Sequence, residues 1–429
     1  MKYCSTRNPS VTYTLSQALQ QGLAHDSGLI VPQAWPNVSH LHQATDLGYP
    51  QFAAQLLTPF FDDDQLASSL PAICQYALNF SVPIKTLNDH AYILELFHGP
   101  TLSFKDVGAR FLANCLARLT DDKPITVMVA TSGDTGSAVA AAFHTQPNIR
   151  VVILFPEGKI STRQQQQITC WGDNVLAIAI DGTFDDCQKL VKSAFADPDW
   201  QQMTQLNTAN SINIGRLLPQ MTYYAYSSIQ FHKQHDGPAH FIVPSGNVGN
   251  VTAAYWAKQL GFPIGDIILA TNANTTIPDF LKSGDYQPRK SIETLANAMD
   301  VGNPSNFERL RQLFGSDQQL QQYLQAYSVS DSQIEAAILD CHQQYGVILC
   351  PHTATAYHVY KNFADKKPWI LVATAHPSKF ETIIEPLLKF EMAVPEHLQN
   401  LLDKKQHLYK SGTELSAIST RYRQYFIRS

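Results

Sequence analysis

The chain has 429 residues, a formal net charge of −5 at neutral pH, 16% charged residues and 44% hydrophobic residues. This length is enough for two or three domains with sizeable cores. The negative charge argues against a nucleic-acid or an anionic membrane surface as a partner, so any bound anion needs a local site. The first ten residues contain no apolar signal segment, and no apolar run approaches the ~20 residues of a membrane span. We therefore expect a cytoplasmic protein without a membrane partner.

Seven cysteines are scattered along the chain without a C-x-x-C pair. An odd number at irregular spacing predicts free, mostly buried thiols and no metal site. The four consecutive glutamines from Gln164 to Gln167 are expected on an exposed helical turn.

Residues 1–90 have a mixed, mainly helical pattern and are expected to form an N-terminal cap domain. From about residue 92, short apolar runs alternate with helical patterns, at 125–130, 151–155, 175–180, 240–243, 267–271, 346–349 and 369–373. Such runs predict parallel strands that are covered on both faces. The expected fold class is α/β, with two open and largely parallel sheets in domains 91–205 and 206–429 and a cleft between them. Residues 283–326 carry no pattern that assigns an element.

Lys105 lies between Phe104 and Asp106, where a helical pattern begins. Apolar residues then recur every four positions on one face, at Val107, Phe111, Cys115 and Leu119. An amine beside Phe104 at this loop-to-helix junction is expected to be partly desolvated, which lowers its pKa and favours attack on an aldehyde. Taken alone, the residue also fits a lysine that lies along apolar surface with its charge in water.

Two predicted strands end in glycine-rich loops that lead directly into helices, TSGDTGSA from Thr131 and PSGNVGN from Pro244. Backbone N–H groups at such a helix N-terminus favour a bound phosphate or carboxylate. Either loop alone also fits an ordinary tight turn. Together with a lysine suited to imine formation, the loops predict one site for a cofactor phosphate and one for a substrate acid group.

Six segments follow one another in the chain, ELFHGPTLSFKD, TSGDTGSA, FPEGKIS, NSINIGR, PSGNVGN and ATAHPSKF. With the opening segment STRNPSVTYTLSQALQQGLAHDSGLIVP, they resemble the threonine synthases, which belong to the fold type II (tryptophan synthase β-like) group of pyridoxal-phosphate enzymes. The resemblance covers most of the chain. It implies conversion of O-phospho-L-homoserine and water to L-threonine and phosphate, the last step of threonine biosynthesis.

The resemblance also implies roles for matching residues. Lys105 would bind pyridoxal 5'-phosphate as the internal aldimine and then carry protons as the free amine. Thr374 would offer its hydroxyl to the pyridine nitrogen, although an ordinary strand-end threonine also fits this place. The cofactor phosphate would be held by backbone amides of the second glycine loop, at Ser245, Gly246, Asn247, Val248, Gly249 and Asn250.

In the first glycine loop, the resemblance implies that five residues hold the substrate α-carboxylate and flank the cofactor 3-oxygen. These are Ser132, Gly133, Asp134, Thr135 and Gly136. A carboxylate at Asp134 would repel both groups unless it were protonated or turned away.

The substrate phosphate requires cations and hydroxyls of its own. The candidates are Lys159, Ser161, Arg163, Asn210 and Arg216, each of which also fits a surface charge or a helix cap. His98 and Lys379 lie in matching segments without an assigned role, and His376 is expected to be packed and hydrogen-bonded.

Domain 91–205 is expected to be mobile and to close on the cofactor domain.

Two other functions fit the same motifs. A phospholyase or a serine/threonine dehydratase that uses the same cofactor would release a 2-oxo acid instead of threonine. A non-catalytic anion-binding protein of this fold would lack cofactor absorbance. In each case the protein is expected to be a monomer or a homodimer.

Overall fold

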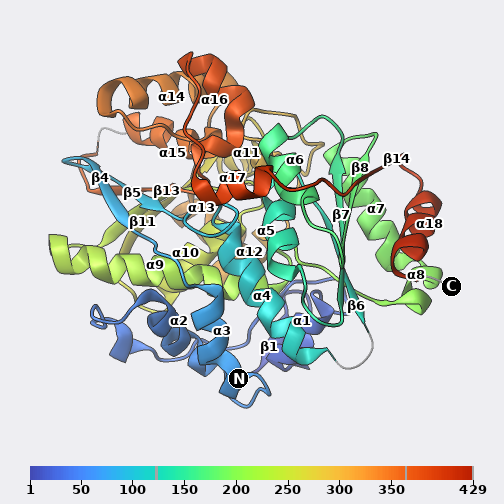
Figure 1. Ribbon diagram of the computed structural model, residues 1–429. Helices are drawn as coiled ribbons and strands as arrows, with labels where there is room; N and C mark the ends of the chain where they lie inside the picture. Colours follow the sequence, from blue (N-terminus) through green and yellow to red (C-terminus); the bar gives the residue numbers. More distant parts are fainter. Residues whose placement is uncertain (121–123, 363–364, 428–429) are drawn as a thin grey trace.

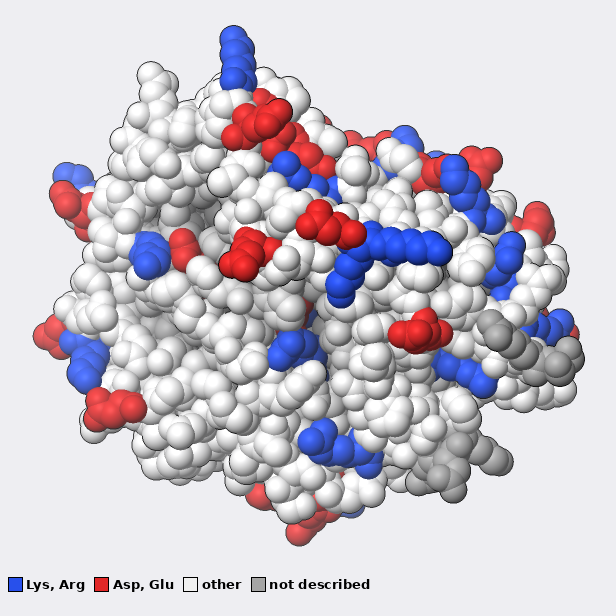
Figure 2. All heavy atoms as spheres, viewed as in Figure 1, with Lys and Arg blue, Asp and Glu red and all other residues white. Residues whose placement is uncertain are grey.

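Two mainly parallel sheets organise the structure, a computed structural model that describes residues 1–120, 124–362 and 365–427. Helices cover both sheets, and the N-terminal elements lie along one side (Figure 1). On the face shown in Figure 2, basic and acidic side chains form small mixed groups that are separated by wide uncharged areas. In the described ranges, no helix is long and apolar enough to cross a membrane.

The smaller sheet has five parallel strands in the order β14-β8-β7-β6-β9. Its strands are β6 (Ile125–Ala130), β7 (Ile149–Pro156), β8 (Val175–Ile180), β9 (Gln205–Asn207) and β14 (Leu408–Ser411). Every residue of β6 and β8 is buried, which explains their unbroken apolar sequences. The associated helices are α5 (Asp134–Phe143), α6 (Thr162–Thr169), α7 (Phe184–Ala196), α8 (Pro198–Met203), α17 (Glu396–Leu402) and α18 (Leu415–Phe426).

The larger sheet has six strands in the order β12-β11-β10-β13-β5-β4. They are β4 (Ile84–Asn88), β5 (Ala91–Glu95), β10 (Ala239–Pro244), β11 (Ile264–Thr271), β12 (Gln325–Ser328) and β13 (Trp369–Ala373). Only the edge strand β4 runs antiparallel to its neighbour. The associated helices are α9 (Ile214–His235), α10 (Gly249–Gln259), α11 (Thr276–Ser283), α12 (Phe307–Phe314), α13 (Asp317–Tyr323), α14 (Asp331–Tyr345), α15 (Pro351–Lys361) and α16 (Glu381–Leu388).

The N-terminal region supports the helix that begins with Lys105, α4 (Lys105–Leu119). Its own helices are α1 (Leu15–Gln21), α2 (Tyr49–Leu57) and α3 (Leu70–Ala77). Helices α1 and α3 pack on α4, and α2 packs on α9. A small antiparallel sheet, of β1 (Tyr3–Ser5), β2 (Thr12–Tyr13) and β3 (Ile30–Pro32), completes the region.

The α/β class and six of the seven predicted strands are confirmed. The seventh, at 346–349, is wrong. Gly346 ends α14 with a left-handed φ of 68°, and Pro351 begins α15, so the apolar run between them is a short helix connection. The unassigned residues 283–326 contain α12 and α13 and the start of β12.

The expected exposure of the glutamine run is also wrong. The four residues lie in α6, but Gln164, Gln166 and Gln167 are buried. Distant groups satisfy their amides, because Gln166 donates to the carbonyls of Leu401 and Lys404. The seven cysteines are free and buried, as predicted.

Strand pairing crosses the predicted domain limits at 91 and 206. Strand β5 follows the first limit but pairs with β13 of the larger sheet, and β14 near the C-terminus pairs with β8 of the smaller one. The chain therefore leaves the larger sheet after β5, builds most of the smaller sheet, and returns at β10.

Gly108 allows α4 to approach α9 closely. An added Cβ would lie 2.6 Å from the carbonyl oxygen of Arg216 and 2.8 Å from its Nε. We expect Gly108→Ala to lower the free energy of unfolding by about 1–3 kcal/mol, the usual cost of overpacking, in urea titrations followed by circular dichroism. Gly412→Ala is the control, since nothing lies within 4 Å of its added Cβ. Equal losses in the two variants would contradict this explanation.

Candidate active site

Lys105 is the first residue of α4, and its Nζ lies 5.9 Å from the ring centroid of Phe104. The backbone N–H of Phe104 donates to the carbonyl of Thr374 at 2.9 Å, which ties this junction to the end of β13. Burial lowers the pKa of Lys105 to about 8; Asp134 opposes this shift, while Arg216 and Lys379 add to it. Among the described residues, the amine has no hydrogen-bond or ion-pair partner. Lys105 therefore loses its proton much more readily near neutral pH than a solvated lysine does.

The first glycine loop joins β6 to α5. The hydroxyl of Thr131 accepts hydrogen bonds from the N–H groups of Gly133 and Gly136, at 3.0 and 2.8 Å. These two amides therefore hold the turn together. The amides of Asp134 and Thr135 have no acceptor in the described part of the chain, and Ser132 and Thr135 are half-buried. The loop thus retains N–H and hydroxyl donors for an anion at the start of α5.

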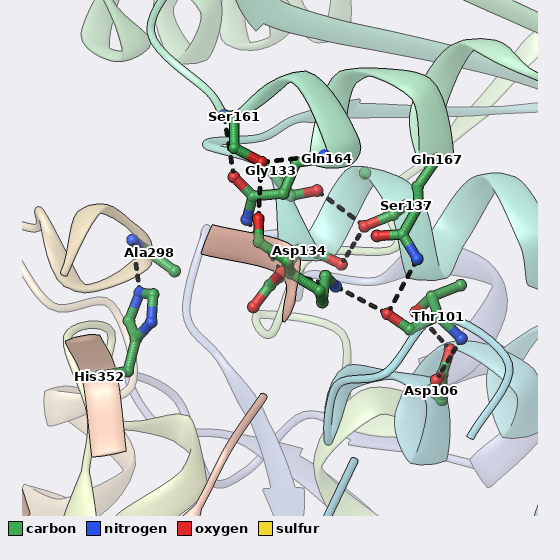
Figure 3. A network of polar contacts seen from close by, with 12 residues as sticks. Thr101, Asp106, Gly133, Asp134, Ser137, Ser161, Gln164, Gln167, Ala298 and His352 are labelled. Carbon is green, nitrogen blue, oxygen red and sulfur yellow. Dashed lines mark hydrogen bonds and ion pairs between the residues drawn. The ribbon is translucent and has the colours of Figure 1, made fainter. Parts of the chain in front are cut away.

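The carboxylate of Asp134 is buried and lies beside Gln164 (Figure 3), and it is paired with a lysine. Its Oδ1 lies 2.7 Å from Nζ of Lys379 and accepts a hydrogen bond from Gln164 at 3.0 Å. Burial by itself would raise the pKa of Asp134, but the charges of Lys379 and then Lys105 outweigh burial and bring the pKa well below its usual range. Asp134 is therefore ionised and paired with Lys379, which differs from the protonated form considered from the sequence.

The second glycine loop, between β10 and α10, presents a row of unbonded amides. Residues 246–250 have backbone N–H groups without an acceptor among the residues described. Gly246 lies against Met299, whose Cα would be 2.5 Å from an added Cβ. Consecutive free amides at a helix N-terminus form a site suited to phosphate.

The side chains of this loop are fixed from outside it. Asn247 donates to Ser211 at 2.7 Å, and its Oδ1 accepts from the N–H of Ser305 at 2.6 Å. The Oδ1 of Asn250 accepts from the hydroxyls of Tyr223 and Tyr224, at 2.5 and 2.8 Å. The Nδ2 of Asn250 is buried and has no partner in the described ranges. Ser245 continues the ladder by donating its N–H to the carbonyl of Ala270 at 3.1 Å.

Thr374 follows β13 and is buried. His352, at the start of α15, is also buried, and its Nε2 accepts a hydrogen bond from the N–H of Ala298 at 3.1 Å (Figure 3). Because Nε2 is the acceptor, the proton of the neutral ring lies on Nδ1. Burial lowers the pKa of His352 to about 4, with Asp134 opposing and Lys105 and Lys379 assisting, so the ring stays neutral.

The candidates for the substrate phosphate are in different environments. Arg216 is buried, donates through Nη1 to the carbonyl of Ala209, and leaves Nε unpartnered among the described atoms. Its pKa is lowered to about 10 by burial, with Asp106 opposing. The Oδ1 of Asn210 is likewise buried and unpartnered within the ranges described. Arg216 therefore has one N–H donor, and Asn210 one oxygen acceptor, without a partner among the described residues.

Three further candidates have protein partners. Lys159 is exposed and pairs with Glu293 at 3.1 Å. Arg163 pairs with Glu385 at 3.0 Å and donates to the carbonyl of Ser378 at 2.8 Å. Ser161 caps α6 and donates to the carbonyl of Lys379 at 2.6 Å. A role in binding phosphate would require Lys159 or Arg163 to exchange its carboxylate partner.

Several groups around the site were not identified from the sequence. Lys379 had no assigned role, and Gln164 was expected in solvent. Thr101 receives a hydrogen bond from Lys379 on its carbonyl at 2.7 Å and donates its own hydroxyl and N–H to Asp106, at 2.7 and 2.8 Å. The capping-box sequence from Ser161 to Gln164 was the available signal for the first turn of α6.

A cavity of about 820 Å³ lies beside the loop that precedes Lys105, but Lys105 does not line it. His98 and His376 are among its lining residues, and His98 pairs with Glu95 at 2.8 Å. The Nδ1 of His376 lies 2.7 Å from the hydroxyl of Ser378, and burial lowers the pKa of His376 to about 4. His376 is therefore packed and hydrogen-bonded, as predicted.

Comparisons with known proteins agree along the whole chain. A family of pyridoxal-phosphate dependent enzymes matches residues 75–375, and the N-terminal and C-terminal threonine synthase families match 2–78 and 353–420. Threonine synthase of Haemophilus influenzae is 40% identical over 430 residues, which cover 100% of both chains.

Solved structures give the same result. The crystal structure of threonine synthase from Escherichia coli matches with a TM-score of 0.92 and 36% identity, covering 99% of this chain and 100% of the other. The pyridoxal-phosphate-bound threonine synthase from Brucella melitensis matches with a TM-score of 0.91 and 32% identity, covering 99% of each chain. The chain therefore belongs to the threonine synthase family of pyridoxal-phosphate-dependent enzymes.

Proposed function

We propose that this enzyme converts O-phospho-L-homoserine and water to L-threonine and phosphate, with Lys105 as the group that binds the cofactor and moves protons. The observation that carries the proposal is a half-buried, desolvated lysine with an unpartnered amine among the described residues, in a chain that has two glycine loops with free amides. Family membership supports the same reaction.

The residues present fit pyridoxal phosphate. The free amides of residues 246–250 suit its phosphate, and the absence of a Cβ at Gly246 lets the loop turn against Met299. The amine of Lys105 suits its aldehyde, and the hydroxyl of Thr374 suits its ring nitrogen. When bound, the cofactor supplies an electron-withdrawing ring that stabilises negative charge at the substrate α-carbon.

Lys105 has the properties of a proton carrier at this α-carbon. Its lowered pKa allows Nζ to accept the α-proton when uncharged and to return a proton when charged. Proton removal at the β-carbon then allows phosphate to leave the γ-carbon. The γ-carbon gains a proton, water adds its oxygen at the β-carbon, and a proton returns to the α-carbon. The same amine, or a group that it serves, handles these protons in turn.

The two acid groups of the substrate need separate donors. Ser132, Thr135 and the amides at the start of α5 suit the α-carboxylate, while Gly133 and Gly136 keep the loop in shape through Thr131. Arg216 suits the phosphate, because its Nε–H donor has no partner within the described residues. Asn210 remains a candidate only through its Nδ2, since its unpartnered Oδ1 is an acceptor. Lys159, Ser161 and Arg163 are further candidates for the phosphate.

The substrate is a small molecule, and neither nucleic acid nor a membrane is proposed as a partner. The net charge of −5 and the mixed charges in Figure 2 support this view. Seven free, buried thiols are consistent with the cytoplasm. We propose that the protein is a monomer or a homodimer. We also propose that domain 91–205 closes on domain 206–429, with residues 1–90 as the cap domain.

The reaction is tested by incubating the cofactor-loaded enzyme with O-phospho-L-homoserine and identifying the product by mass spectrometry. We expect threonine and phosphate in equal amounts, and a 2-oxo acid would instead indicate a lyase or dehydratase.

Lys105→Ala should reduce turnover about a thousandfold or more, because covalent binding and proton transfer are both lost. Lys85→Ala, at an exposed lysine of β4, should retain activity. A colourless protein without activity would support the non-catalytic alternative.

The phosphate loop is tested with Gly246→Ala. Because the added Cβ would lie 2.6 Å from the carbonyl oxygen of Met299, the loop must shift. We expect the dissociation constant for pyridoxal phosphate to rise about tenfold or more, a change of ~1.4 kcal/mol, in equilibrium dialysis. Gly237→Ala is the control, since the nearest atom to its added Cβ is 3.7 Å away. Unchanged affinity in Gly246→Ala would refute this role.

The protonation of Lys105 is tested on the cofactor-free protein by brief acetylation with acetic anhydride between pH 6 and 10. Only the uncharged amine reacts, so labelling should rise with pH and reach half of its maximum at about pH 8. Peptide mass spectrometry gives the extent of labelling, and N-acetyl-lysine amide in the same tube gives the response of a solvated amine, with a midpoint near ~10.4. A midpoint for Lys105 equal to that of the standard would contradict desolvation.

A further inference from the structure

Two lysines, Lys379 and Lys105, interact with the same buried carboxylate, that of Asp134, but in different ways. The side chains of Lys379 and Asp134 are 0% and 4% exposed, and Nζ lies 2.7 Å from Oδ1. The same ammonium donates to the carbonyl of Thr101 at 2.7 Å. Lys105, by contrast, interacts with Asp134 only through its charge.

The contacts of Lys379 fix both ends of the residue. Its carbonyl accepts the hydroxyl of Ser161, which is the N-cap of α6. Gln164, from the same first turn of α6, donates to Asp134. Lysine and carboxylate are therefore positioned by one helix N-terminus, so their separation does not depend on a flexible surface side chain.

Four charged or titratable groups face Lys105 from four elements. They are Asp134 of α5, Arg216 of α9, His352 of α15, and Lys379 of the short 3₁₀ helix at Pro377–Phe380. Asp134 favours the charged form of the Lys105 amine, whereas Arg216 and Lys379 disfavour it. After burial, which has the largest effect on the pKa of Lys105, the charge of Asp134 is the next influence on how strongly the amine holds its proton.

We propose that Lys379 is a positioning residue that takes Asp134 as its ion-pair partner, so that this carboxylate does not become the partner of Lys105. The pair then acts on the reaction through the free amine of Lys105, and to that extent the inference rests on the proposed function. A purely stabilising role is a weaker explanation, because buried ion pairs often contribute little net stability once desolvation is counted.

The proposal is tested by the acetylation titration of Lys105 in cofactor-free Lys379→Met protein. Methionine keeps the length and the apolar stem of lysine but removes its charge. Two effects raise the pKa of Lys105 in this variant: the repulsion from Lys379 is lost, and the carboxylate of Asp134 loses its partner, so we expect the midpoint to rise by about one unit or more. In the loaded enzyme, the acidic limb of the pH profile of kcat should move in the same direction, because the amine of Lys105 is free only once substrate is bound.

The matched control is the double variant Lys379→Met/Asp134→Asn, in which both charges of the pair are absent. Its midpoint should return to the wild-type value or fall below it, because no carboxylate is left to hold the Lys105 proton. A midpoint in Lys379→Met equal to that of the wild type would overturn the proposal. So would a double variant whose midpoint stays as high as that of the single variant, since the effect would then not pass through Asp134.

Folding is checked by circular dichroism in each variant. If Lys379→Met does not fold, the single variant Asp134→Asn decides the question. It removes the charge that favours protonation of Lys105, so the midpoint must fall below the wild-type value, and an unchanged midpoint overturns the proposal. The titration uses neither substrate nor cofactor. Its failure is therefore distinct from failure to form threonine, which would reject the proposed reaction instead.

Discussion

The negative charge of the buried carboxylate of Asp134 must be balanced by protein groups, because water does not reach it. The groups that balance this charge determine the electrostatics of the site. Lys379 and Gln164 meet one of its oxygens directly. Lys379 also bonds Thr101, and Thr101 in turn bonds Asp106 in the first turn of α4. The charge balance at α5 is therefore linked by direct contacts to the helix that carries Lys105.

The topology of the larger sheet explains why the residues proposed to bind the cofactor lie at the same edge of the sheet. Strand β10 has β11 on one side and β13 followed by β5 on the other. The chain thus reverses its direction of winding between β10 and β13, and ligands of open α/β sheets bind at such a point, beyond the carboxyl ends of the strands. The amides of residues 246–250 follow β10, Thr374 follows β13, and the segment leading to Lys105 follows β5.

Local sequence patterns were sufficient to predict most strands and the two glycine loops. A strand that is buried on both faces gives a continuous apolar run, and a loop that leads into a helix gives a short glycine-rich sequence. The run at 346–349 was misassigned since an apolar connection between two buried helices has the composition of a short strand. The glutamines of α6 were misplaced because their partners, Asp134 and the carbonyls of Leu401 and Lys404, come from distant parts of the chain. The pairing of Lys379 with Asp134 was missed for the same reason.

The different surroundings of the two lysines explain how one site can contain a fixed cation and a reactive amine. Lys379 has two oxygen acceptors at 2.7 Å, the carboxylate of Asp134 and the carbonyl of Thr101. Lys105 stands at the first position of α4, where the helix dipole disfavours a positive charge, and has no acceptor among the described residues. Burial disfavours the charge of Lys105, and no contact with an oxygen acceptor offsets it among the described residues. The amine without such contacts is the one that can lose its proton near neutral pH.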